Sequence, residues 1–142
     1  MEFSEIKVGA HVVIKGCACR LAEVNKSKPG KHGSAKKTVV GIDVITGKKY
    51  QEMYNHSSMI GKPDIQRVRY VVTNVEPNED HYWFSLMDCD SGEMSDDLRF
   101  EKDDNSDKVS ELFDDAESPV VVLMVVKIED NTQHKIVEVT KE

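Results

Sequence analysis

The residues of this chain with the clearest chemical potential are five lysines that lie close together. They occupy positions Lys26, Lys28, Lys31, Lys36 and Lys37. The segment 26–37 also contains His32 and has no acidic residue. Neighbouring ammonium groups repel one another, and water screens them only over about 8 Å at physiological salt. The cluster therefore predicts either a solvated loop or a site that binds phosphate groups.

Glycines flank the central lysine of this cluster. Gly30 and Gly33 bracket Lys31 and His32, and Pro29 precedes them. Glycine permits positive φ and proline restricts the approach, so the pattern predicts a narrow hairpin tip that exposes Lys31. Ordering a tip that repels itself costs conformational entropy and buries no apolar surface. A functional role explains the segment better than a contribution to stability does.

The residues around the lysine cluster predict a small β-rich unit. Short β-branched or alternating runs predict strands over 10–15, 19–24, 38–45 and 48–53. Thr46 and Gly47 predict a tight turn, and Gly61-Lys62-Pro63 predicts a linker. Several short strands with glycines at the corners are typical of a small barrel or sandwich. The lysine cluster then connects the second strand to the third.

The second half of the chain predicts another small barrel, with one helix. Strand patterns cover 67–75, 82–88, 120–128 and 134–140, with a turn at 90–92. Val109, Leu112 and Phe113 form a helical stripe, which predicts a short helix over 107–116. Three strands, a helix and two strands is the order of an OB-fold. We therefore expect a mainly β protein with two small β-barrels in tandem, in domains 1–66 and 67–142.

The charge is distributed unevenly between these two domains. The whole chain carries −7, but residues 1–66 contain 11 Lys and Arg against 6 Asp and Glu, and residues 67–142 contain 8 against 20. The net charge is thus +5 for the first half and −12 for the second half. An RNA-rich partner is expected to meet the first half, because a phosphate backbone is attracted to lysine and repelled by carboxylates.

The remaining composition indicates where the protein works. No run of apolar residues approaches the roughly 20 residues that a membrane span needs. The start of the chain does not have the basic residues followed by an apolar stretch that are typical of a secretory signal. Three cysteines cannot form a closed disulfide framework, which suits a reducing compartment. We expect a cytoplasmic protein without membrane contact.

Two longer strings carry a resemblance to a known family. SKPGKHGSAK at 27–36, followed by VGIDVITGKKY at 40–50, resembles the hypusine loop and the next strands of translation factor 5A, the eukaryotic and archaeal relatives of bacterial elongation factor P. The DSGEMSDDLR stretch at 90–99 is similar to that family's second domain. The resemblance implies an SH3-like barrel followed by an OB-fold. It also implies that deoxyhypusine synthase transfers an aminobutyl group from spermidine to Lys31 and that deoxyhypusine hydroxylase then completes hypusine.

The resemblance further implies a role on the ribosome. The modified lysine would contact ribosomal RNA and peptidyl-tRNA and promote slow peptide bonds, such as those between prolines, by positioning the reactants. The chain itself would be no enzyme and would need no bound cofactor, metal or DNA. Several loop residues match the family or its archaeal members. The resemblance implies that they contact RNA or the modifying enzymes; they are Lys28, Pro29, Gly30, His32, Gly33, Ala35 and Lys36. Ser34, like Pro29, stands where many eukaryotic members have another residue.

The sequence also has to be compared with three other kinds of site. A P-loop fails because Asn25 occupies the place of its first glycine and His32 that of its Ser or Thr. A metal site fails because the three cysteines have no paired ligand spacing, so free thiols are expected. The alternative that stays open is a general single-stranded RNA-binding OB-fold. Its stacking platform would consist of Tyr70, Tyr82, Trp83 and Phe84.

Overall fold

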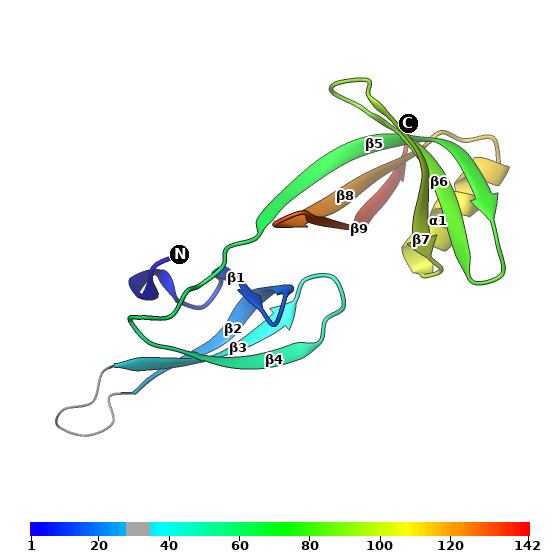
Figure 1. Cartoon of the computed structure of the whole chain (residues 1–142). Helices are drawn as coiled ribbons and strands as arrows, with labels where there is room; N and C mark the ends of the chain where they lie inside the picture. Colours follow the sequence, from blue (N-terminus) through cyan, green and yellow to red (C-terminus); the bar gives the residue numbers. More distant parts are fainter. Residues whose placement is uncertain (28–34) are drawn as a thin grey trace. The chain divides into compact units, whose positions relative to one another are not determined.

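The computed structural model describes residues 1–27 and 35–142, and most of these residues lie in β-strands. They form two compact units, which consist of residues 1–65 with 126–133 and of residues 66–125 with 134–142. Each unit is built on one sheet, and the described residues contain a single α-helix (Figure 1). The predicted class is confirmed: an SH3-like N-terminal sheet is followed along the chain by an OB-like sheet with one short helix.

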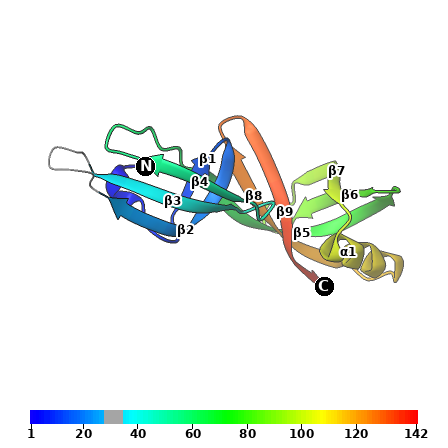
Figure 2. The ribbon, with the colours of Figure 1, turned by 90° about the horizontal axis from the view of Figure 1, so that it is seen from below.

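The first unit contains a four-stranded sheet in the order β1-β2-β3-β4. A 3₁₀ turn, η1 (Phe3–Glu5), precedes the strands β1 (His11–Ile14), β2 (Cys17–Ser27), β3 (Lys36–Asp43) and β4 (Lys49–Tyr54). Neighbouring strands are antiparallel, and β2 runs beside β3 over most of its length (Figures 1 and 2). The four predicted strands are present, but β2 and β3 extend further toward the lysine-rich segment than the sequence indicated.

Alternating side chains of these strands form the core of the first unit. Its fully buried members include Val12, Ile14, Leu21 and Val39. Gly41 faces the same core, and a methyl group there would lie 2.7 Å from Ile14 Cδ1. Gly61, predicted to belong to a linker, instead accepts a hydrogen bond from the Val13 N–H at 2.9 Å, because the chain returns alongside β1.

The second unit contains the helix α1 and most of a five-stranded sheet in the order β7-β6-β5-β8-β9; residues 64–65 at the start of β5 and residues 126–133, where β8 joins β9, are grouped with the first unit. Its elements are β5 (Asp64–Pro77), β6 (His81–Asp88), β7 (Met94–Glu101), α1 (Asp104–Asp114), β8 (Pro119–Ile128) and β9 (Asn131–Lys141). The strand β7 follows the predicted turn at 90–92 and completes the predicted order of three strands, a helix and two strands. No helix in the described part of the chain could span a membrane.

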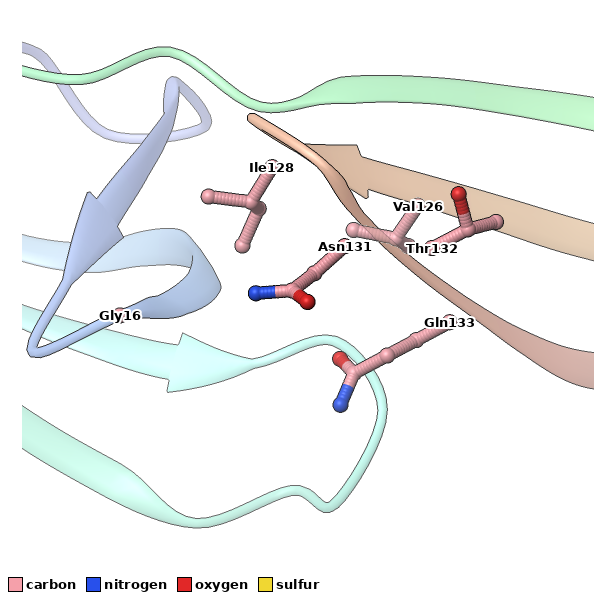
Figure 3. A pocket seen from close by; sticks show the side chains of 6 residues that line it. All are labelled: Gly16, Val126, Ile128, Asn131, Thr132 and Gln133. Carbon is pink, nitrogen blue, oxygen red and sulfur yellow. The ribbon is translucent and has the colours of Figure 1, made fainter.

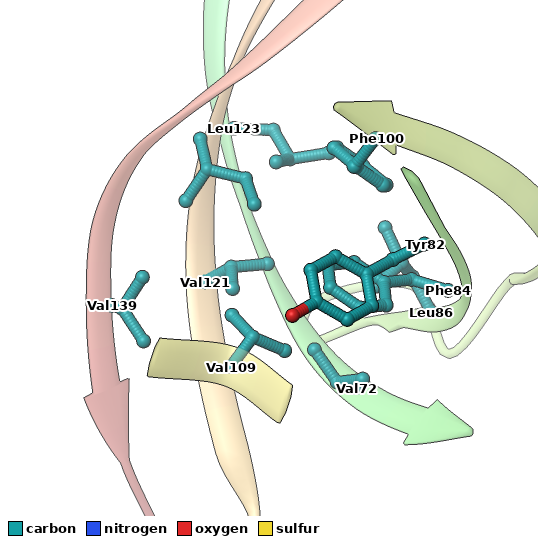
Figure 4. Close-up of a cluster of buried hydrophobic side chains, with 10 residues drawn as sticks. Val72, Tyr82, Phe84, Leu86, Phe100, Val109, Val121, Leu123 and Val139 are labelled. Carbon is teal, nitrogen blue, oxygen red and sulfur yellow. The ribbon is translucent and has the colours of Figure 1, made fainter. Parts of the chain in front are cut away.

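The helix α1 begins three residues before the predicted start. Asp103 caps it, because the Asp103 carboxylate accepts the Ser106 N–H at 2.8 Å and the Ser106 hydroxyl accepts the Asp103 N–H at 2.9 Å. This reciprocal cap lies inside an acidic run, where it is hard to recognise as a start signal. Val109 on α1 is fully buried against Tyr82, Phe84, Leu86 and Val121 (Figure 4).

Candidate functional site

The described part of the predicted lysine site is the paired end of β2 and β3. Ser27 pairs with Lys36, and Lys26 pairs with Lys37. Asn25, Lys26 and Ser27 are all exposed, so the β2 strand of this pair faces solvent at its end. Hydrogen bonding across the pair holds the two chain ends that flank residues 28–34 next to each other.

Most of the predicted site residues lie outside the described residues. They are Lys28, Pro29, Gly30, Lys31, His32 and Gly33, together with Ser34. Ala35 and Lys36 are described: both are half-buried, and Lys36 is the first residue of β3. The structure therefore shows the strand ends that flank residues 28–34, and the roles of residues 28–34 stay a prediction.

Lys37 differs from the role predicted for the lysine cluster. It is only 6% exposed, and its ammonium donates hydrogen bonds to the carbonyl oxygens of Phe3 at 2.8 Å and of Ile6 at 3.0 Å. Burial, and secondly the charge of Lys26, lowers the pKa of Lys37. The Lys37 side chain is therefore not available to bind a phosphate. The prediction that all five lysines are solvated or bind phosphate is wrong for Lys37.

The N-terminal turn η1 provides the environment of the Lys37 ammonium. The turn presents the Phe3 and Ile6 carbonyls, and the ring of Phe3 lies 4.7 Å from Nζ in a cation–π contact. The Phe3 ring also packs against His56 at a centroid distance of 4.4 Å. The sequence contained one signal for this burial: Lys37, Val39, Gly41 and Asp43 alternate along β3, and all four are buried.

The opposite end of β3 is held by a turn around Asp43. The Asp43 carboxylate accepts the N–H of Ile45 at 2.8 Å and of Thr46 at 3.2 Å. Burial alone would raise the pKa of Asp43, but these donors outweigh it and keep the pKa below its usual value. Gly47 has φ +78° and closes the turn that the sequence predicted. Asp43 thus fixes the entry to β4 and acts as a structural group.

The three cysteines are free thiols in different environments. Cys17 is half-buried, Cys19 is buried and Cys89 is exposed. Burial, followed by the charge of Asp43, raises the pKa of Cys19 to about 11, which makes this thiol a poor nucleophile. Within residues 1–27 and 35–142, no cluster of His, Cys, Asp or Glu could hold a metal ion.

A pocket of the first unit offers no group for acid–base chemistry. It is lined by Gly16, Val126, Ile128, Asn131, Thr132 and Gln133 (Figure 3). These residues supply amides, one hydroxyl and apolar surface, and none of them titrates near neutral pH.

The aromatic residues of the second unit do not form the stacking platform of the alternative interpretation. Tyr82 and Phe84 are buried, and their rings stack on each other at 5.4 Å with planes 19° apart (Figure 4). Tyr70 is partly buried against the same cluster. Trp83 alone points to the other side of the sheet, because side chains alternate along β6. Three of the four predicted stacking residues belong to the core instead.

The comparisons with known proteins agree on one family. Residues 1–58 match the family model described as translation initiation factor 5A-like, N-terminal. Eukaryotic translation initiation factor 5A of Dictyostelium discoideum is 33% identical over 121 residues, which cover 85% of this chain and 73% of the relative. Translation initiation factor 5A-2 of Arabidopsis thaliana is 38% identical over 120 residues, with coverage of 84% and 73%.

Solved structures extend the similarity over nearly the whole chain. A translation initiation factor eIF-5A family protein from Naegleria fowleri superposes with a TM-score of 0.79 at 32% identity and covers 99% of this chain and 96% of its own. Eukaryotic translation initiation factor 5A from Methanococcus jannaschii gives a TM-score of 0.66 at 26% identity, with coverage of 99% and 92%. On this combined similarity of sequence and structure, the chain belongs to the translation initiation factor 5A family.

Proposed function

We propose that this translation factor acts on the ribosome through a hypusine formed at Lys31. Deoxyhypusine synthase transfers the aminobutyl group of spermidine to the lysine nitrogen and releases 1,3-diaminopropane, and deoxyhypusine hydroxylase then hydroxylates the new side chain with dioxygen as the oxidant. Membership of the translation initiation factor 5A family supports this proposal. The observation that carries it is the match of residues 27–36 to the hypusine loop, between strand ends that the structure pairs at Ser27 and Lys36.

The chemistry of lysine explains why a separate enzyme is needed. A free lysine ammonium has a pKa of about 10.4, so at neutral pH almost none of it is nucleophilic. The modifying enzyme must therefore take the side chain into its own site and remove the proton. Glycines on both sides of Lys31 and His32 reduce the bulk that has to enter.

The modified side chain gains a second amine on a longer arm. Lys26 is exposed and Lys36 half-exposed at the base of the loop, so both can contact phosphates without reading sequence. In this proposal the peptidyl-transferase centre is the target, and the long side chain supports the acceptor end of peptidyl-tRNA. Holding the reactants in a productive geometry accelerates slow bonds such as Pro–Pro, while the ribosome performs the catalysis.

Intact-mass analysis of the protein from its native source tests the modification directly. We expect a hypusine increment that peptide fragmentation places on Lys31. The variant Lys31→Arg retains the charge but cannot be modified, and it should lose support of proline-rich translation in a reconstituted assay. Lys48→Arg, at an exposed lysine of the same unit, is the matched control and should remain active. An unmodified Lys31 in the native protein, or full activity of Lys31→Arg, would overturn the proposal.

A further inference from the structure

One face of the sheet in the second unit carries apolar side chains that point away from the core. Trp83 on β6 pairs with Glu76 on β5 and with Arg99 on β7. Further along β6, Met87 pairs with Val71 on β5 and with Met94 on β7. Paired residues lie on the same face of a sheet, and Tyr82, Phe84 and Leu86 occupy the buried face. We call the surface of Val71, Glu76, Trp83, Met87, Met94 and Arg99 the Trp83 face.

The Trp83 face is accessible and partly organised in advance. Met94 is 51% exposed, and Val71, Trp83 and Met87 are half-buried. The indole and the ring of His81 form a T-shaped contact, with ring centroids 5.3 Å apart and planes at 86°. The helix α1 contributes Val109 and Leu112 to the opposite, buried side of the sheet. Apolar side chains on an accessible face are typical of a binding surface, and tryptophan often supplies much of the binding energy there.

The charge around the Trp83 face is mainly negative. Between residues 67 and 102 the sequence contains nine acidic residues against Arg67, Arg69, Arg99 and Lys102. Arg69 is exposed and lies two residues before Val71, on the same side of β5. Arg99 is already paired with Glu101, with its Nε 3.1 Å from Oε1. The exposed carboxylates of this segment belong to Glu76, Glu79, Asp80, Asp90, Glu93, Asp96, Asp97 and Glu101. The apolar strip is therefore surrounded by an excess of negative charge, which Arg69 and Arg99 compensate only in part.

We propose that the Trp83 face docks a basic, arginine-containing segment of a protein partner. A guanidinium can lie on the indole face of Trp83 in a cation–π contact while it pairs with the Glu76 carboxylate. Apolar side chains of the same segment fit the strip formed by Val71, Met87 and Met94. A nucleic acid is the less suitable occupant, because its phosphates would meet the surrounding carboxylates. A negative surface also attracts a basic partner from a distance and raises its association rate.

The single tryptophan of the chain makes this proposal directly measurable. Trp83 fluorescence reports only on this face, so the full chain is titrated with an octapeptide of alternating arginine and leucine. An octapeptide of alternating glutamate and leucine is the matched control. We expect a saturable change in Trp83 emission with the basic peptide, weakened by added salt, and no change with the acidic one.

Charge reversal locates the binding surface. Glu76→Lys should weaken binding of the fluorescein-labelled basic peptide by about tenfold, while Glu138→Lys, the same charge change at an exposed position of β9, should leave it within about twofold. Circular dichroism checks that both variants are folded. The proposal is overturned if both variants bind equally well, or if an oligouridylate changes Trp83 emission at lower concentration than the peptide. It is also overturned if sedimentation shows a dimer that Glu76→Lys dissociates, because the face would then hold a second copy.

This proposal does not depend on Lys31. The peptide titration uses protein with an unmodified lysine, and the mass measurement uses no peptide. Failure of either experiment therefore leaves the other result valid.

Discussion

The ammonium nitrogen of Lys37 lies 2.8 Å from the carbonyl oxygen of Phe3. Through this hydrogen bond the first turn of the chain is attached to β3, one residue beyond Lys36 at the base of the proposed hypusine loop. Lys26 and Lys37 are paired across the two strands. The bond holds the ammonium group of Lys37 at the N-terminal turn, which keeps it apart from the ammonium group of Lys26. The N-terminal turn is thus attached to the strand that follows residues 28–34.

Lys37→Met should destabilise the first unit by about 1 to 3 kcal/mol, because hydrogen bonds from a charged group are lost and the Ile6 carbonyl keeps no replacement donor. Urea unfolding followed by circular dichroism measures the change. Amide exchange should accelerate at Glu5 and Ile6, whose N–H groups close the turn. Lys26→Met removes the exposed lysine that pairs with Lys37, and it should lower the free energy of unfolding by less than about 0.5 kcal/mol. Equal effects of the two substitutions would show that Lys37 does not hold the turn.

Gly41→Ala should destabilise the same unit by about 1 to 3 kcal/mol, because the new methyl group would lie 2.7 Å from Ile14 Cδ1 and 2.8 Å from Cys19 Cβ. Neither neighbour can withdraw without opening the packed core. The thermal midpoint, followed by circular dichroism, checks this. Thr38→Ala, at an exposed position of β3, is the control and should change it little. If Gly41→Ala and the parent protein have the same thermal midpoint, the close packing around Gly41 is contradicted.

Tyr82→Phe should weaken the attachment of α1 to the sheet. The Tyr82 hydroxyl donates to the Asp107 carboxylate at 2.6 Å, and this bond is the main cause of the raised pKa of Tyr82, ahead of burial. Loss of a hydrogen bond to a charged group should cost about 1.5 to 3 kcal/mol. Urea unfolding followed by Trp83 fluorescence reports on this unit. Tyr50→Phe, in the first unit, should leave that transition unchanged, and an unchanged transition for Tyr82→Phe would refute the role of the bond.

His134 should make the second unit less stable in mild acid. Burial lowers the pKa of His134 below its usual value of 6.5. The unfolded chain therefore binds this proton more readily than the folded one, so stability is complete above about pH 6.5 and falls as the pH decreases toward the folded pKa. Urea midpoints from Trp83 fluorescence at about pH 7.5 and about pH 5.5 should show the loss. His134→Gln should reduce the difference, and an undiminished difference would assign the pH dependence to other groups.

Local patterns were sufficient to predict most of the elements. Alternation predicted the strands around Val39 and Phe84, and the stripe of Val109, Leu112 and Phe113 predicted the helix. These signals are strong because burial on one side imposes a fixed period on the sequence. The start of α1 at Asp104 was not predicted, because its cap lies in an acidic run. The length of β2 was also underestimated, because exposed residues such as Asn25 and Lys26 carry no apolar alternation.

The candidate site was predicted in part. Residue types and spacing predicted an exposed, glycine-flanked Lys31, whereas its modification was implied by the family resemblance and stays a prediction. The burial of Lys37 could not be predicted in the same way, since its acceptors belong to Phe3 and Ile6, more than 30 residues away.

The sequence by itself determined the mainly β class, the division of charge and the position of the lysine-rich segment, because each depends on composition or on short-range periodicity. Only the tertiary structure decided which charged and aromatic side chains are free to act. Lys37 is withdrawn into the N-terminal turn and Tyr82 and Phe84 into the core, while Trp83 is left on an acidic, accessible face. The physical reason is that availability depends on neighbours that pairing and packing bring from distant parts of the chain.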